Sequence, residues 1–394
     1  MANATPVVVT GLGVMSPFGA GVDTYWDGLY SGTCGIRKIS LIDTTGFACA
    51  IAAEVPDPIP GSQRRSRADR LALAAAREAI ADAGLDRRDR TDMAVVVGAV
   101  GGGMLEAEDW YWAKSRTGRE SDPTPLRSVL PSSHAEVIGH ALGLTGPRET
   151  VVAACSSGAA AIVLAADLVA EGIVPCAIAG GADALTRICY MGFNALKLLD
   201  VTACRPFDVD RKGMSIGEGA GFLVLENPAR ARARGARVYA ELAGGTITSD
   251  AYHPTSPEPS GDGMTRAMRG ALTQARLAPA DVQYVNAHGT ATPQNDRVEA
   301  RAIREVFGEG RVLVSSTKSM IGHTMAAAGG LEAVATVLAL VHGAVPPTVH
   351  HERPSAEVAF DCVPGVARDM GVGAAISNSF GFGGQNVTLA FRAA

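Results

Sequence analysis

Short, nearly unbroken runs of apolar residues alternate along this chain with longer stretches in which small and apolar residues recur at helical spacing. Runs rich in Val, Ile and Ala with few polar interruptions are typical of strands covered on both faces. We predict such strands at residues 6–10, 93–98, 149–154, 176–180, 221–226, 238–242, 282–286, 311–315, 374–377 and 387–391. We predict helices at residues 68–83, 157–170, 263–275, 296–307 and 325–342. This alternation indicates an α/β protein with sheets held between helical layers.

The chain also contains two stretches that resemble each other. VVVTGLGVMSPFG (7–19) and AAISNSFGFGGQN (374–386) both run from an apolar strand into a loop with Gly and Phe, and 149–170 resembles 311–342 in the same way. A length of 394 residues exceeds the usual range of a single core. We therefore predict two similar halves, residues 1–245 and 246–394, although these residues alone leave internal duplication and coincidence equally open.

Composition narrows the function classes. Apolar residues make up 47% and charged residues 19% of the chain, which argues against disorder, and a net charge of −5 argues against nucleic-acid binding through phosphate contacts. Seven Cys without a CxxC pair or zinc-like spacing indicate a reducing compartment and no metal site. We found neither a secretory leader nor an apolar run of about 18 residues, so we expect a cytoplasmic protein that does not bind membranes.

The first candidate for chemistry is Cys155 in ETVVAACSSGAAA (149–161), at the point where a predicted strand passes into a helix. Free amides at a helix N-terminus lower the pKa of a thiol and can also hold an oxyanion during acyl transfer. The small residues that follow leave the sulfur reachable. This stretch alone leaves open the alternative of a buried structural Cys.

Two histidines follow other predicted strands. His288 lies in VNAHGTATPQND (285–296), where it can serve in proton transfer or donate a hydrogen bond to an anion. His323 lies in VSSTKSMIGHTMAAAGG (314–330), five residues after Lys318, and a helix dipole would keep it neutral. Glu332 is nine residues further along that helix. The alternatives are structural histidines, an exposed Lys318 and a helix cap.

Taken together, these motifs make the sequence resemble the elongating β-ketoacyl-[acyl carrier protein] synthases, the condensing enzymes of fatty-acid and polyketide synthesis. The resemblance covers nearly the whole chain, because seven motifs occur in the family's order. They are VVVTGLGVMSPFG, ACSSG, FDVDRKGMSIGEGAGFLVLE, SDAYHPTSP, VNAHGTATPQND, SSTKSMIGH and NSFGFGGQN. It implies the thiolase fold, a five-layered α-β-α-β-α structure with two duplicated mixed-sheet halves, dimeric as a rule.

The resemblance also implies a mechanism. Cys155 would accept an acyl chain from the phosphopantetheine arm of an acyl carrier protein. His288 and His323 would promote decarboxylation of a malonyl carrier and stabilise the enolate, which attacks the thioester and extends the chain by two carbons. The backbone amides of Cys155 and Phe382 would form the oxyanion hole, with Phe382 as a moving gate. The chain itself would bind no cofactor, since its substrates are carried on phosphopantetheine.

Further roles carry over by motif position. Lys318 and Glu332 would organise the site around His323. We also assign four residues to the substrate-binding region: Thr290 and Thr292 would hold the phosphopantetheine arm, while Asp296 and Glu299 would support the loop and helix behind His288.

Departures from the family pattern bear on the pathway. Gln385 stands where fatty-acid enzymes usually have Thr, the segment before residue 64 is shorter than usual, and Trp110, Tyr111 and Trp112 form an unusual aromatic triplet. With the Arg-rich bias, these features favour a polyketide or polyene synthase in secondary metabolism, with housekeeping fatty-acid elongation as the alternative. Ketosynthases of this type often pair with a homologous chain-length factor, so we expect either a homodimer or such a heterodimer.

Other members of the superfamily fit less well. A non-condensing chain-length factor lacks the nucleophilic Cys, a biosynthetic thiolase carries a second catalytic Cys near its C-terminus, and an initiating synthase has Asn where this chain has His323. Cys362 lies in FDCVPG, outside any such loop. For the acidic carrier protein we predict a docking patch of Arg64, Arg65, Arg67 and Arg70, with an ordinary solvated basic face as the alternative.

Overall fold

One mixed sheet runs through the computed structural model, which describes residues 6–118 and 122–394. Within these residues it has eleven strands in the order β11-β10-β14-β15-β9-β1-β8-β7-β5-β6, with β2 paired to β1. The strands before the chain midpoint are β1 (Val7–Ser16), β2 (Gly19–Ala20), β5 (Ala94–Gly98), β6 (Arg148–Val151), β7 (Cys176–Asp183) and β8 (Gly219–Glu226). Those after it are β9 (Ala240–Ser249), β10 (Tyr284–Asn286), β11 (Leu313–Ser315), β14 (Ala374–Gly381) and β15 (Gln385–Ala393). Two separate two-stranded sheets pair β3 (Arg37–Lys38) with β4 (Ile51–Ala52) and β12 (Ala344–Val345) with β13 (Arg368–Asp369).

Helices connect and cover these strands. In the first half they are α1 (Val22–Tyr30), α2 (Arg67–Asp82), α3 (Met104–Thr117), η1 (Thr124–Ser128), α4 (Ser133–Leu142), α5 (Ser157–Ala170), α6 (Arg187–Ala195) and α7 (Pro228–Ala233). In the second half they are α8 (Asp262–Ala275), η2 (Pro279–Asp281), α9 (Pro293–Phe307), α10 (Lys318–Ile321), η3 (Met325–Ala327) and α11 (Ala328–His342).

The strand order is the same in the two halves. In the first, β6, β5 and β7 are parallel, and β8 and β1 follow antiparallel. In the second, β11, β10 and β14 are parallel, and β15 and β9 follow antiparallel. The predicted duplication of mixed-sheet halves is therefore confirmed. The boundary at residue 245 stays a prediction; it lies within β9, whose start pairs with β1 of the first half and whose whole length pairs with β15 of the second.

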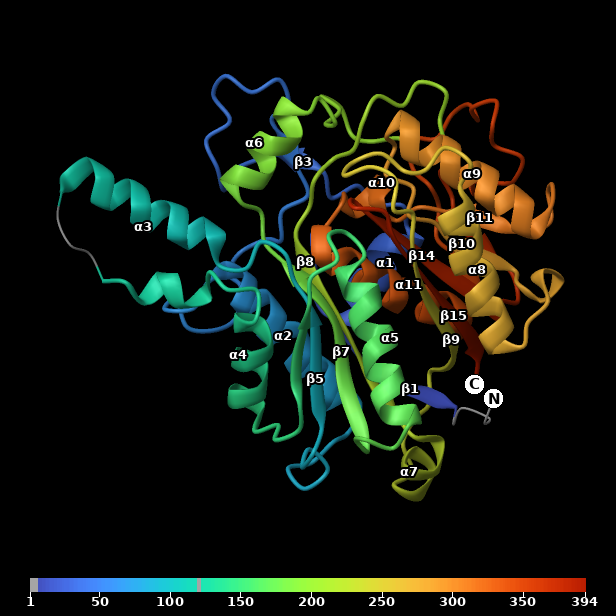
Figure 1. Ribbon diagram of the computed structural model, residues 1–394, viewed down its shortest axis with the longest axis horizontal. Helices are drawn as coiled ribbons and strands as arrows, with labels where there is room; N and C mark the ends of the chain where they lie inside the picture. The colour runs from blue at the N-terminus through green and yellow to red at the C-terminus, as the bar shows by residue number, and fades with distance from the viewer. Residues whose placement is uncertain (1–5, 119–121) are drawn as a thin grey trace.

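Two helices, α5 and α11, lie between the halves, and the outer faces are covered by α2 and α4 on one side and by α8 and α9 on the other (Figure 1). The two central helices approach through glycines: a Cβ on Gly329 would lie 2.3 Å from the backbone nitrogen of Ala159. We expected no apolar run of about 18 residues, and this expectation was wrong. The helices η3 and α11 together form an apolar helical stretch, Met325–His342, of 18 residues. Of its residues, 89% are buried, as in a core helix between the two halves.

All the predicted strands and helices have counterparts in the structure, within a few residues at most ends. The prediction missed α1, α3, α4, α6 and α7. Of these, α3 projects from the body as an arm (Figure 1) and has only Leu105 buried, so its sequence lacks the apolar stripe by which helices are recognised. The aromatic triplet lies on this arm, where Tyr111 and Trp112 are exposed.

Candidate active site

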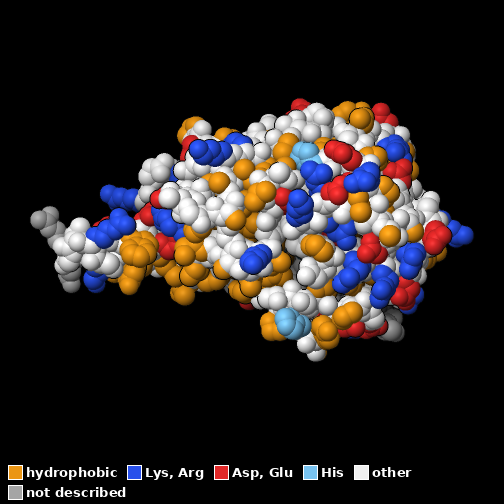
Figure 2. All heavy atoms as spheres, turned by 90° about the horizontal axis from the view of Figure 1, so that it is seen from above, with side chains coloured by type: hydrophobic (Ala, Val, Ile, Leu, Met, Phe, Trp, Pro, Cys, Tyr) orange, Lys and Arg blue, Asp and Glu red, His pale blue; other side chains and the backbone are white. Residues whose placement is uncertain are grey.

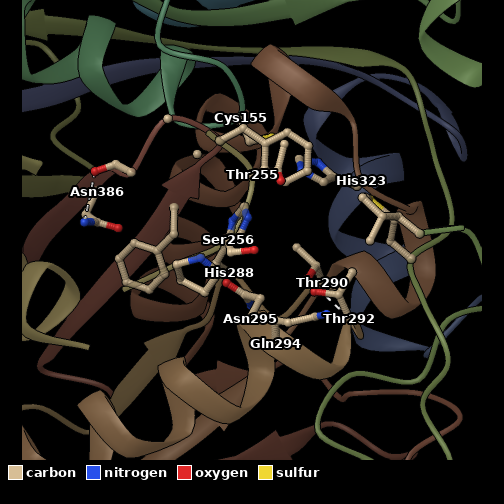
Figure 3. A pocket seen from close by; sticks show the side chains of 18 of the residues that line it. Cys155, Thr255, Ser256, His288, Thr290, Thr292, Gln294, Asn295, His323 and Asn386 are labelled. Atoms are coloured by element: carbon tan, nitrogen blue, oxygen red, sulfur yellow. Dashed lines mark hydrogen bonds between the residues drawn. The ribbon is translucent and has the colours of Figure 1, made fainter. Parts of the chain in front are cut away.

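The site lies where the carboxyl ends of the parallel strands of both halves meet, a common position for active sites in α/β proteins. Cys155 follows β6, while Lys318 and His323 follow β11, the strand of the second half that is equivalent to β6. His288 follows β10. Cys155, His288 and His323 all line one cavity (Figure 3). The fold therefore brings together three side chains that are separated by up to 168 positions in the chain.

Cys155 is held in a tight turn before α5. Ala154 has a left-handed backbone with φ of 47°, which is unfavourable for a residue with a side chain. Ser156 Oγ donates to the carbonyl of Ala153 (2.8 Å), and Ser157 Oγ donates to the carbonyl of Ala154 (2.6 Å). The two serines, which the sequence suggested only as small neighbours of the sulfur, thus fix the turn that presents Cys155.

The electrostatic environment of Cys155 differs from the expectation. Burial raises the pKa of its thiol to about 11, although Lys318 and the backbone amides of Phe382 and of Cys155 itself act in the opposite direction. The predicted lowering of the pKa by the helix end was therefore wrong, because loss of solvation in the buried site outweighs it. The same two amides that were expected to form an oxyanion hole do interact with the sulfur.

The imidazole of His323 is fixed by the backbone that follows it. Its Nδ1 accepts a hydrogen bond from the backbone N–H of Met325 (3.2 Å), so its proton must be on Nε2. Nε2 is buried without a hydrogen-bond partner among the described residues. The backbone N–H of His323 donates to the carbonyl of Ser215 (2.7 Å). His323 thus presents an unused N–H donor at the cavity.

His288 is fixed by a side chain instead. Lys318 Nζ lies 3.3 Å from His288 Nδ1 and also pairs with Glu332, and both Lys318 and Glu332 are 1% exposed. An ammonium group can only donate, so Nδ1 accepts and the proton of His288 is also on Nε2. Lys318 is therefore not the exposed residue of the alternative interpretation, but a buried link between Glu332 and His288.

Both histidines are uncharged. Burial lowers the pKa of His288 and of His323 well below the usual value, and the positive charge of Lys318 adds to the effect. The predicted neutrality is thus present, but burial and Lys318 are its causes rather than a helix dipole. Their rings lie edge to face with centroids 5.3 Å apart. Two neutral N–H donors side by side can stabilise negative charge on a carbonyl oxygen without giving up a proton.

The carboxylates of Glu299 and Asp296, both on α9, accept hydrogen bonds from backbone N–H groups and do not face the cavity. Glu299 accepts hydrogen bonds from the backbone N–H groups of His288 and Gly289 (both 2.8 Å), and Asp296 accepts from those of Phe207 (2.7 Å) and Ala291 (3.1 Å). Neither carboxylate lines the cavity. Their geometry is that of a support for the His288 loop.

The remaining predicted residues line the cavity. The hydroxyls of Thr290 and Thr292 are 2.8 Å apart, and Phe382 packs on Phe193 with ring centroids 6.0 Å apart. An apolar wall of the cavity was not predicted; it consists of Phe193, Leu196, Leu198 and Met214. The first three come from α6 and the segment after it, which carry no motif, so only the fold identifies them. Met214 lies within the motif FDVDRKGMSIGEGAGFLVLE, but nothing in that motif indicated that its side chain faces the cavity.

The predicted arginine patch is wrong in part. Arg67 is 4% exposed and pairs with Glu218, and Arg70 is 9% exposed, so neither is available to a partner. They belong to the first turn of α2, which turns these side chains inward; Arg64 and Arg65 lie before the helix and remain accessible. Within the described residues, no group of His, Cys, Asp and Glu is arranged to hold a metal ion.

The comparisons with known proteins agree with this geometry. The sequence model of the beta-ketoacyl synthase N-terminal domain matches residues 4–231, and that of the C-terminal domain matches residues 239–352. The chain is 41% identical to a 3-oxoacyl-[acyl-carrier-protein] synthase 2 of Synechocystis, over 98% of this chain and 97% of that protein.

Two solved structures are also similar. The ishigamide ketosynthase/chain length factor has a TM-score of 0.95 and 36% identity over 99% of this chain and 100% of that one. A ketosynthase from a type II polyketide synthase, in complex with its acyl-carrier protein and bound to the hexaketide, has a TM-score of 0.92 and 30% identity over the same shares. The expected thiolase fold is thus confirmed.

Proposed function

Because the chain belongs to the beta-ketoacyl synthase family and is an acyltransferase of the 3-oxoacyl-[acyl carrier protein] synthase class, we propose that Cys155 is its acylated residue and that His288 and His323 are its decarboxylation pair. The observation that carries this assignment is the pair of neutral Nε2–H donors at the cavity that Cys155 also lines. Lys318 and Glu332 position His288, and Glu299 and Asp296 position its loop.

In the first half-reaction, the sulfur of Cys155 attacks the acyl thioester of an acyl carrier protein. The amides of Cys155 and Phe382 stabilise the oxyanion, and their interaction with the sulfur supports this role. The carrier thiol leaves with the proton that Cys155 loses, since a thiol with a pKa of about 11 is protonated at neutral pH. Thr290 and Thr292 contact the arm that brings the acyl chain.

In the second half-reaction, a malonyl carrier loses carbon dioxide, and the electron pair of the broken C–C bond forms an enolate. The Nε2–H groups of His288 and His323 donate to its oxygen, which only neutral histidines can do without protonating the carbanion. The enolate carbon attacks the acyl thioester, and Cys155 leaves as a thiolate that takes a proton from solvent. The carrier departs with a β-ketoacyl chain two carbons longer.

We also propose the pathway in which the enzyme acts. The likeness to a ketosynthase of a type II polyketide synthase bound to the hexaketide favours secondary metabolism of the polyketide or polyene type, as do Gln385 and the aromatic triplet. The identity to a 3-oxoacyl-[acyl-carrier-protein] synthase 2 supports housekeeping fatty-acid elongation equally, which is the second candidate. In either pathway the partner is an acyl carrier protein, and we place the enzyme in the cytoplasm.

The proposal is tested by intact-mass measurement after incubation with acyl carrier proteins that bear either a saturated or a conjugated polyunsaturated chain. We expect one acyl adduct per chain, absent from the Cys155→Ala variant. Faster acylation by the unsaturated carrier supports the polyene pathway, and faster acylation by the saturated carrier supports fatty-acid elongation. An adduct that persists in Cys155→Ala would refute the assignment of the nucleophile.

A further inference from the structure

A carboxylate outside all the family motifs lies directly behind His323. Asp183 ends β7 and is 1% exposed. Its Oδ1 accepts a hydrogen bond from the backbone N–H of Gly101 (2.8 Å), and its Oδ2 accepts one from the backbone N–H of Ala326 (3.1 Å). Gly101 belongs to the first half and Ala326 to the second, so this one side chain joins the halves at the level of the active site.

Ala326 belongs to the turn that sets the tautomer of His323. Met325, which directly precedes Ala326, donates its backbone N–H to His323 Nδ1 and has a left-handed backbone with φ of 56°. A residue with a side chain holds such a conformation only where its surroundings fix it. The bond from Ala326 to Asp183 fixes the peptide that immediately follows Met325.

The carbonyl side of Ala326 is fixed by close packing. A Cβ on Gly158 would lie 2.6 Å from the carbonyl oxygen of Ala326, and a Cβ on Gly181 would lie 2.1 Å from it. Gly158 is in the first turn of α5, three residues after Cys155, and Gly181 is on β7 two residues before Asp183. Ala326 is therefore held at its N–H by Asp183 and at its C=O by the backbone of β7 and of the start of α5, which follows Cys155.

We infer that Asp183 is a positioning residue that holds the turn of residues 323–326 against the start of α5 and so keeps the Nε2–H of His323 directed at the substrate. The inference rests on the proposed role of His323 in decarboxylation. It predicts a selective effect: Cys155 is held by its own serine-fixed turn, so the acylation step does not depend on Asp183, whereas decarboxylation and condensation do.

The test compares the two half-reactions in Asp183→Asn. The amide presents an NH2 group to one of the two backbone N–H donors, which removes one acceptor and sets donor against donor. We expect kcat for condensation to fall about tenfold, as for other small misplacements of a catalytic group. The KM for the malonyl carrier and the rate of Cys155 acylation by a short-chain carrier should stay within about twofold of the wild type. Asp183→Glu, which keeps both oxygens, should restore most of the condensation rate.

A matched control separates positioning from general destabilisation. Glu226 is also a fully buried carboxylate and ends β8 at the opposite end of the sheet, where it pairs with Arg230 and Arg234. Glu226→Gln should lower thermal stability without splitting the half-reactions. If Asp183→Asn does not fold, Gly101→Ala gives a milder disturbance, because its Cβ would lie 3.0 Å from Asp183 Oδ1; the same split, smaller in size, is expected.

Two results would overturn the inference: acylation and condensation falling in parallel in the Asp183 variants, or the same split in Glu226→Gln. Failure of the wild-type protein to form any Cys155 adduct is a different result, which would refute the proposed function itself.

Discussion

The two active-site histidines are held in the same tautomer by different means. Lys318 fixes His288 through a side chain, whereas a backbone N–H fixes His323. A side chain can be removed by mutation, but a backbone amide can only be displaced. Substitutions can therefore address His288 directly, while His323 is reached only through residues that hold its turn, of which Asp183 is the clearest.

The support of His288 gives a prediction about pH. Burial raises the pKa of Glu299 to about 7, since it outweighs the backbone amides of Gly289 and His288 that favour the carboxylate. As the pH falls through 7, Glu299 takes up a proton and no longer accepts both amides equally well. We expect the condensation rate to fall on this acidic side, and Glu299→Gln to be slower than wild type but without that dependence. An acidic limb unchanged in Glu299→Gln would assign it to another group.

The stability of the protein should respond in the opposite direction. A carboxyl group whose pKa is raised by folding, from about 4.3 in an unfolded chain, stabilises the fold fully at low pH, and this contribution is lost as the pH rises through 7. Glu299 therefore favours activity at the pH values where it contributes least to folding.

At this scale the sequence predicts some features and not others. Cys155, His288 and His323 are recognisable because their motifs place reactive side chains at strand ends. The raised pKa of Cys155 was not predictable, because it depends on burial by residues remote in sequence. Asp183 lies outside every motif, so the sequence does not single it out. Arg67 was interpreted as a surface charge, because its buried partner Glu218 is 151 positions away in the chain.

At the level of elements, close packing of α5 and α11 on the strands gives a prediction about glycine. Gly181→Ala would place a Cβ 2.1 Å from the carbonyl oxygen of Ala326, on a rigid backbone that cannot move aside. We expect the free energy of unfolding to fall by about 2–3 kcal/mol, the usual cost of overpacking a core. Thermal or urea unfolding measures it.

Gly192→Ala is the matched control. Gly192 lies in α6 with no atom within 4 Å of its Cβ position, and its backbone is helical. Ala at such a site should raise stability by up to about 1 kcal/mol. Equal destabilisation by both substitutions would contradict the explanation by close approach.

The difference between buried and exposed elements explains which of them could be predicted from the sequence. Strands such as β5 and β7 are apolar throughout because both their faces are covered, and this makes them conspicuous. In the arm helix α3 only Leu105 is buried, so its pattern of apolar and polar residues does not distinguish it from a loop.

At the level of the whole molecule, exposed apolar side chains gather near the arm. The accessible side chains are Tyr111 and Trp112 on α3, Leu126 in η1, Leu130 after it, and Val152 after the edge strand β6. Figure 2 shows hydrophobic side chains along the face between arm and body. Extended apolar patches of this kind mark interfaces. We expect a dimer through this face, in keeping with the family.

Light scattering over a range of concentrations tests this expectation. Leu130→Asp, at a position 66% exposed, should weaken the dimer by about tenfold or more, since it buries a charge in the interface. Val366→Asp, 77% exposed in the second half, should leave it unchanged. A wild-type protein that stays monomeric alone would instead favour pairing with a chain-length factor.

The strand β9 lies between β15 and β1 in the sheet. Val9 of β1 and Ala393 of β15 both pair with Ala240, so the first and the last strand in chain order flank the same strand. Strands are spaced about 4.8 Å apart, so Val9 and Ala393 are about 10 Å from each other, within reach of a short peptide. Joining them and opening the chain at Gly235, where the turn before β9 leaves open space, would create a circular permutant in which the histidine half precedes the cysteine half. The architecture itself therefore does not require the order in which the two halves follow each other in the chain.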